Sequence, residues 1–183
     1  MSEIMLDIET LSTTPNSVIL TIGAIKFNRY HEIKDIKDLE TFYVRIDQNS
    51  CKKLNMDISE GTLSWWNLQP DEYKYEALLN KDRISIYDAL KSLTNFIKNC
   101  KYIWANSPNF DCTILENAYK LCNLEIPWKF YNLRDTRTVY DLGNINLKSV
   151  GETQHHALYD CYNQIVALNK SLKNLKLIKN NSS

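Results

Sequence analysis

The first residues of the chain alternate between apolar and polar positions in the manner of a β-strand. Residues 4–10 read Ile-Met-Leu-Asp-Ile-Glu-Thr. Because successive side chains of a strand point to opposite faces, Asp7 and Glu9 share a face with Met5. A nearly continuous apolar run at 18–27 predicts a central strand, and a third strand is expected at about 40–46. Three successive strands favour an antiparallel meander.

The rest of the chain alternates between helical and strand patterns. Ser85 followed by Asp88 resembles a capping box at the start of a helical stripe that reaches Ile97. Strands followed by βα alternation predict an α/β fold, a mixed sheet flanked by helices. No linker divides the chain, so we expect one domain at 1–175 and a polar tail at 176–183. The other expected elements are helices at 62–69 and 71–79, a strand at 101–105, and helices at 108–121, 134–142 and 155–172.

The overall charge is balanced, with 22 basic and 22 acidic residues. A protein that coats nucleic acid through charge alone is normally basic, so this balance argues against that class. No apolar run reaches membrane-spanning length, and no basic leader precedes an apolar stretch, so we expect neither a membrane partner nor export. The five cysteines form no CxxC pair and are expected to be thiols in a reducing compartment.

Asp7 and Glu9 are the most informative polar residues. They lie about 7 Å apart by strand rise, close enough to bridge one or two cations. Burying two carboxylates in an apolar strand costs free energy unless a positive charge compensates. The pattern therefore indicates a divalent metal.

Asp111 stands at the start of the helix predicted at 108–121, with Ser107 as the expected cap and Pro108 as the first residue. Counting back by three and four residues from Ile114 and Leu115 places Asp111 on the buried face. The alternative interpretation is structural. An acid in the first turn is stabilised by the helix dipole, and Asp111 then needs no role in binding or catalysis.

Asp160 lies near the start of the last predicted helix, beside its apolar stripe. Two histidines, His155 and His156, precede it. Histidine exchanges a proton near neutral pH, although a lone histidine is more often structural. The alternative interpretation of Asp160 is an acid near the start of the helix that is exposed to solvent and has no functional role.

Taken together, these acids resemble the motifs of the DnaQ-like 3′–5′ exonucleases of the DEDDh type, which have a ribonuclease H-like fold. The first motif is Asp7-Ile8-Glu9-Thr10, the second spans Asn106 to Asp111, and the third spans His155 to Asp160. Ser64-Trp65-Trp66 and Arg134 to Thr138 also resemble the branch that includes phage exodeoxyribonuclease A and related bacterial exoribonucleases. That branch implies the cytoplasm of a bacterium or of a phage-infected host.

The resemblance implies a phosphodiesterase that removes nucleoside 5′-monophosphates from the 3′ end of single-stranded DNA or RNA. Two divalent cations, Mg²⁺ or Mn²⁺, would stabilise the attacking and leaving oxygens, and hard oxygen ligands suit these ions. The implied ligands are Asp7, Glu9, Asp111 and Asp160. The implied base is His155, with His156 as the alternative.

The same resemblance implies a set of substrate contacts, and a homodimer is a further expectation. Trp65 or Trp66 would stack on a base; the alternative interpretation is that at least one of the two belongs to the core. Arg134 and Arg137 would either hold phosphates or pair with Asp135 and Asp141. The expected substrate contacts are Thr10, Leu11, Trp66, Asn109 and Phe110.

Two other functions use the same residues. A catalytically silent module that binds nucleic acid or a protein partner would usually have lost an acid or the histidine, and all five are present. A hydrolase of small or cyclic oligonucleotides would need the same site.

Overall fold

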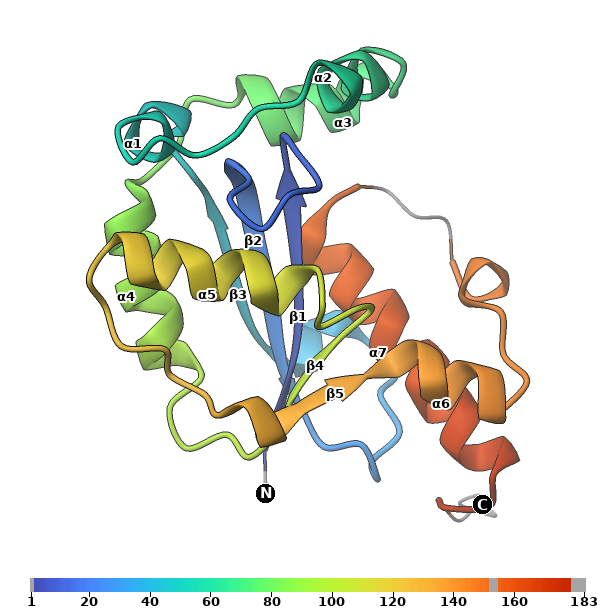
Figure 1. Cartoon of the computed structure of the whole chain (residues 1–183). Helices are drawn as coiled ribbons and strands as arrows, with labels where there is room; N and C mark the ends of the chain where they lie inside the picture. The colour runs from blue at the N-terminus through green and yellow to red at the C-terminus, as the bar shows by residue number, and fades with distance from the viewer. Residues whose placement is uncertain (1, 152–154, 179–183) are drawn as a thin grey trace.

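A five-stranded mixed sheet runs through the molecule in the order β3-β2-β1-β4-β5 (Figure 1). This computed structural model describes residues 2–151 and 155–178. β1 pairs antiparallel with β2, which pairs antiparallel with β3, while β4 lies parallel to β1 and β5 parallel to β4. The predicted meander and the α/β fold class are confirmed. The strands are β1 (Glu3–Thr10), β2 (Ile19–Phe27), β3 (Glu40–Arg45), β4 (Ile103–Ala105) and β5 (Leu133–Asp135).

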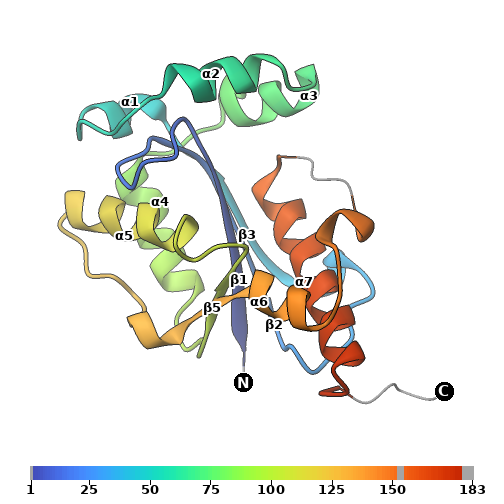
Figure 2. The same cartoon turned by 45° about the vertical axis from the view of Figure 1, so that its right-hand side comes forward.

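Helices cover both faces of the sheet (Figures 1 and 2). α4 and α5 pack on one face, α6 and α7 cover the other, and α1 to α3 lie beyond the end of β1 that carries Glu9. Among the described residues, no helix is long and apolar enough to cross a bilayer. The helices are α1 (Gln48–Lys52), α2 (Glu60–Asn67), α3 (Asp71–Lys74), α4 (Ile86–Phe96), α5 (Asp111–Leu121), α6 (Thr136–Leu142) and α7 (Ala157–Asn174); a π turn spans Tyr75–Leu79, and 3₁₀ turns span Ile36–Asp38, Phe130–Asn132 and Leu147–Ser149.

The alternation of β1 divides the core between the two faces. Leu6 and Ile8 belong to the cluster under α4 and α5, while Met5 belongs to the cluster under α7. Asp7 and Glu9 share the face of Met5 and therefore look toward α7.

α7 approaches the sheet closely at Gly23, opposite Asp7 in β2. A Cβ at Gly23 would lie 2.4 Å from the carbonyl carbon of Ala157, far inside a normal contact. Glycine is therefore required where the first turn of α7 crosses the sheet. This close approach brings Asp160 over the end of β1.

Three predicted helices begin two or three residues later than expected, and they are α5, α6 and α7. Residues Leu133–Asp135 form β5, and α6 begins only at Thr136, because β5 pairs with the edge of β4. α5 begins at Asp111 after Phe110, with no side-chain cap. The predicted cap at Ser107 is wrong, since its hydroxyl instead accepts a hydrogen bond from Nη2 of Arg137.

Other local predictions agree with the structure. The Ser85 hydroxyl accepts a hydrogen bond of 3.1 Å from the backbone N–H of Asp88, as the capping-box pattern predicted. All five cysteines are free thiols. α7 ends at Asn174, and the predicted tail falls outside the described residues from 179 onward.

Candidate active site

Three carboxylates from two elements meet at the end of β1. Oxygen atoms of Asp7, Glu9 and Asp160 all lie within 4.8 Å of one another. The strand provides the first two on one face, and the first turn of α7 provides the third. Asp160 is buried, with 7% of its surface exposed. Such a group of buried hard oxygens matches what a divalent cation requires.

Asp111 joins this group from the start of α5. Its Oδ1 accepts a hydrogen bond of 3.2 Å from the backbone N–H of Ile8. β4 ends at Ala105, and the Asp111 carboxylate satisfies this buried backbone donor of β1. Burial raises the pKa of Asp111 to about 7, although the hydrogen bond from Ile8 opposes the rise.

The pKa values of the two strand acids are perturbed in the same direction. Burial raises the pKa of Asp7 and of Glu9 well above the ordinary range, and the negative charges of Asp111 and Asp160 add to this effect. A bound cation would reverse the effect, because an opposite charge at close range favours the ionised form. The donor set and its electrostatics therefore fit a divalent metal.

A cavity of about 230 Å³ opens over the acids, and His155 forms part of its wall. The imidazole of His155 lies edge-on to Trp65, with 4.7 Å between ring centroids. Burial lowers the pKa of His155 below its ordinary value. The cavity is lined by Asp7, Ile8, Glu9, Asn106, Phe110, Asp111, Leu147, Gly151, His155, Asp160, Asn163 and Gln164.

His156 faces a different part of the molecule. Its ring stacks on Tyr43 at 4.4 Å, and its Nε2 lies 3.8 Å from Oε1 of Glu76. It lines a separate cavity together with Glu72, Tyr73 and Glu76. Of the two adjacent histidines, His155 is the one that shares a cavity with the acids.

The sequence interpretation missed Gln164. Its Nε2 donates a hydrogen bond of 2.8 Å to Oδ1 of Asp7, and the side chain is only 3% exposed. Its Oε1 is buried without a hydrogen-bond partner among the described residues. The available signal was its spacing, because a residue four positions after Asp160 lies on the same face of the helix.

A second cavity of about 340 Å³ adjoins the first and shares Ile8, Glu9 and Phe110 with it. Trp65, 39% exposed, forms one side of this second cavity. The remaining lining residues are Thr10, Thr13, Gly61 and Thr62.

Several predicted substrate contacts lie elsewhere. Trp66 is 1% exposed and donates from Nε1 to the carbonyl oxygen of Thr10 at 2.9 Å, so it supports the end of β1 from within the core. Its burial leaves no ring face for a base, and Trp65 is the tryptophan beside the cavity. Leu11 is buried in the core, and Asn109 is exposed and lines neither cavity.

The two arginines that were considered as phosphate contacts differ in their partners. Arg137 pairs with Asp135 at 3.1 Å, as one of the two interpretations predicted. Arg134 instead lies over the ring of Tyr102 and donates to the carbonyl oxygens of Tyr131 and Leu133.

Comparisons with known proteins agree with this architecture. The structure is similar to that of E. coli exonuclease I in complex with a dT13 oligonucleotide, with a TM-score of 0.68, 16% identity and coverage of 94% of this chain and 41% of that chain. This chain thus spans about two fifths of the length of that relative. It is also similar to the nuclease domain of 3′hExo, a DEDDh family member bound to rAMP, with a TM-score of 0.57, 15% identity and coverage of 100% of this chain and 96% of that one.

At these identities the structural likenesses establish the fold, which is the expected ribonuclease H-like one. A comparison with curated proteins gave no match. The family assignment comes from the sequence, because the model of the 3′–5′ exoribonuclease Rv2179c-like domain matches residues 2–172. This match confirms the resemblance to 3′–5′ exonucleases, and the chain belongs to the Rv2179c-like 3′–5′ exoribonuclease domain family.

Proposed function

We propose that this chain is a metal-dependent 3′–5′ exonuclease that hydrolyses single-stranded nucleic acid and releases nucleoside 5′-monophosphates. The observation that carries the proposal is the meeting of three carboxylates within 4.8 Å at the end of β1. Asp111 and His155 complete the wall of the same cavity. Family membership supports the direction of hydrolysis.

The cofactors in this proposal are two divalent cations, Mg²⁺ or Mn²⁺. Asp7, Glu9, Asp111 and Asp160 would hold them, since all four line the same cavity and provide the carboxylate oxygens that these ions prefer. When bound, such ions polarise the phosphoryl group and make water nucleophilic near neutral pH.

His155 is the proposed general base. Burial lowers its pKa, so the imidazole is neutral and able to accept a proton at neutral pH. Its position in the cavity of the acids supports this role, whereas His156 faces Glu76 in another cavity. Gln164 holds one oxygen of Asp7 through its amide and thereby orients that carboxylate.

The second cavity is the proposed site of the terminal base. Trp65 and Phe110 provide aromatic surface there, and aromatic side chains bind single-stranded bases by stacking. The two cavities share Glu9 and Phe110. A nucleotide whose base occupies the second cavity would therefore place its phosphate toward the cavity over the acids.

A cytoplasmic location, in a bacterium or an infected host, belongs to the same proposal. Five free thiols suit a reducing compartment. A homodimer stays a prediction that sedimentation of the purified chain would test.

The test uses 5′-labelled DNA and RNA strands of equal sequence, with Mn²⁺ or EDTA. We expect a ladder that shortens from the 3′ end and disappears with EDTA or with Asp7→Asn. His155→Ala should lower the rate by about 10²- to 10⁴-fold, the usual contribution of a general base, while the matched His156→Ala retains most activity.

Two results would contradict the proposal. Binding without hydrolysis under every condition would favour a silent nucleic-acid module. Hydrolysis restricted to dinucleotides or cyclic dinucleotides would favour a hydrolase of small oligonucleotides.

A further inference from the structure

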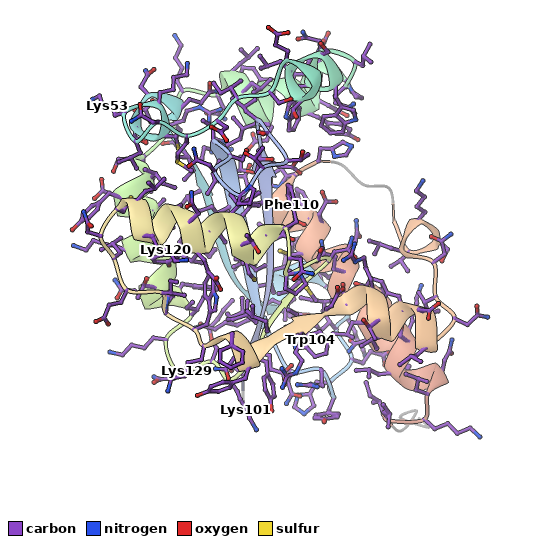
Figure 3. The ribbon with its side chains drawn as sticks, in the orientation of Figure 1. Lys53, Lys101, Trp104, Phe110, Lys120 and Lys129 are labelled. Carbon is purple, nitrogen blue, oxygen red and sulfur yellow. The ribbon has the colours of Figure 1, made fainter. Side chains whose placement is uncertain are left out.

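A group of basic and aromatic side chains lies at the end of the sheet opposite the acids. We call it the basic-aromatic patch. Tyr102 is placed at the start of β1, because its carbonyl oxygen accepts a hydrogen bond of 2.9 Å from Ile4. Figure 3 shows Lys101 and Lys129 at this end of the molecule, away from Phe110 of the candidate active site. The patch consists of Lys101, Tyr102, Lys129, Phe130, Tyr131 and Arg134.

The side chains of the patch form two groups of contacts, one around the ring of Tyr102 and one around the ring of Tyr131. The guanidinium of Arg134 lies 4.0 Å and the Nζ of Lys101 4.9 Å from the ring centroid of Tyr102. The Nζ of Lys129 lies 5.8 Å from the ring of Tyr131. The ring of Tyr131 meets that of Phe130 edge-on at 5.3 Å.

The positive charges of the patch are not neutralised by nearby acids. Within residues 2–151 and 155–178, no carboxylate forms an ion pair with Lys101, Lys129 or Arg134. By contrast, Arg29, which follows β2 and also lies over Tyr102, and Arg45 of β3 are both paired with glutamates. In a chain with zero net charge, this leaves a local positive field.

Two of the three aromatic residues of the patch are exposed to solvent. Phe130 is 83% exposed and Tyr131 is 56% exposed. A large exposed aromatic surface commonly marks a binding site. Exposed rings beside unpaired cations match single-stranded nucleic acid, whose phosphates need positive charge and whose bases stack on aromatic faces.

We propose that the basic-aromatic patch binds the upstream part of a single strand whose 3′ end occupies the active site. This inference rests on the proposed exonuclease function. From Glu3 to Glu9, β1 spans about 20 Å by strand rise, so only a strand of several nucleotides can reach both places. From Arg134 in the patch, the chain continues through Asp135 at the end of β5 to Arg137 in α6, which donates to the hydroxyl of Ser107 just before α5. The patch would therefore make affinity depend on substrate length.

The test measures binding of a labelled single strand of about 20 nucleotides by fluorescence anisotropy at several salt concentrations, in an Asp7→Asn background that prevents hydrolysis. The patch variant is Lys101→Gln with Lys129→Gln. The matched control is Lys53→Gln with Lys91→Gln, which removes the same charge from exposed lysines elsewhere (Lys53 in Figure 3). Lys91 also lies over a tyrosine, at 5.5 Å from the ring of Tyr87.

We expect the patch variant to bind more weakly and the control to bind normally. Loss of two phosphate contacts should reduce the slope of log affinity against log salt by about 1.4, since each contact on a single strand contributes about 0.7. Phe130→Ala should weaken binding by about five-fold or more through lost stacking. With Asp7 intact, hydrolysis of a trinucleotide, which is too short to reach the patch, should be unchanged by any of these substitutions.

Three outcomes would overturn the inference. One is equal affinity and salt slope in the patch and control variants. Another is an absence of binding to the long strand even without patch substitutions. The third is a change of oligomeric state in sedimentation that is specific to the patch variant, which would assign this surface to a second copy of the chain. If the patch variant binds weakly but the unsubstituted chain hydrolyses nothing, the proposed function fails, and the part of the inference that stands is the binding of single strands by the patch.

Discussion

The side-chain amide of Gln164 donates a hydrogen bond of 2.8 Å to Oδ1 of Asp7 and so connects α7 to the end of β1. Asp7 is half-buried and surrounded by like charges, and this neutral donor helps to hold its carboxylate in one orientation. The second polar atom of Gln164, Oε1, lacks a partner among the described residues. Asp7 and Gln164 both line the cavity over the acids.

Gln164→Ala should therefore weaken metal binding without unfolding the chain. A residue that orients a metal ligand typically contributes about 10- to 100-fold in affinity or activity. Calorimetric titration with Mn²⁺ and single-turnover hydrolysis would measure the two effects separately, and thermal unfolding in EDTA would report on folding. An unchanged Mn²⁺ affinity would show that the hydrogen bond has no orienting role.

Mn²⁺ should raise the melting temperature of the chain. A ligand that binds only the folded state adds about 2.7 kcal/mol at 100 times its Kd. For a chain of this size that corresponds to roughly 5–10 °C. Asp7→Asn is the control, and it should lose most of the increase. A melting temperature that does not respond to saturating Mn²⁺ would argue against a preformed metal site.

The adjacent tryptophans Trp65 and Trp66 should have separable roles. Trp65→Ala should raise KM through lost stacking, by about 1–3 kcal/mol of binding free energy, with little change in melting temperature. Trp66→Ala should instead lower the free energy of unfolding by about 3–5 kcal/mol, because it leaves a cavity in the core. Kinetics and denaturant unfolding of both variants would measure these effects, and a purely structural effect of Trp65→Ala would contradict the assignment.

Gly23→Ala should damage both packing and activity. The added methyl group would lie 2.4 Å from backbone of Ala157, and a helix backbone cannot yield as a flexible side chain can. We expect a loss of about 1–3 kcal/mol in stability and a larger loss of Mn²⁺ affinity, because Asp160 moves with α7. Gly61→Ala is a control, since its nearest contact is an ordinary 3.5 Å.

His156 should make the protein less stable in mild acid. Burial lowers its pKa, although Glu76 opposes the shift, so the folded chain binds this proton less readily than the unfolded chain. The contribution of neutral His156 is therefore fully present above about pH 6.5 and is lost as the pH falls through its lower, folded pKa. The pKa of Glu76 is also lowered on balance, and that effect acts only below its ordinary carboxyl range.

His156→Asn should consequently show a shallower fall in melting temperature between about pH 7.5 and about pH 5.5 than the unsubstituted chain. Measurements in EDTA keep the metal out of the comparison. The buried acids and His155 titrate in both proteins, so the difference isolates His156. Identical pH profiles would show that its burial does not affect stability.

Much of the site could be anticipated because it follows strand and helix periodicity. The face shared by Asp7 and Glu9 is fixed by the two-residue repeat of β1, and the buried position of Asp111 follows from the three-four spacing of α5. The ordered motifs around these acids and Asp160 indicated the family, which the sequence match confirms.

Predictions from local sequence patterns were wrong where a contact between residues far apart in the chain decides the structure. Arg134 and Asp135 were predicted at the start of a helix but belong to β5, because the edge of β4 offers backbone partners. Ser107 was expected to cap a helix, but Arg137 donates to its hydroxyl. Trp65 and Trp66 are neighbours of one residue type, and only the packing of α2 against Thr10 makes one exposed and the other buried.

The sequence by itself therefore determined which acids are available and on which face of its own element each one lies, because periodicity is a local property of the backbone. Only the tertiary structure decided that Asp7, Glu9 and Asp160 meet within 4.8 Å, that His155 and not His156 shares their cavity, and that Gln164 reaches Asp7. These relationships depend on how closely α7 crosses the sheet at Gly23, and that distance is set by packing between residues far apart in the chain.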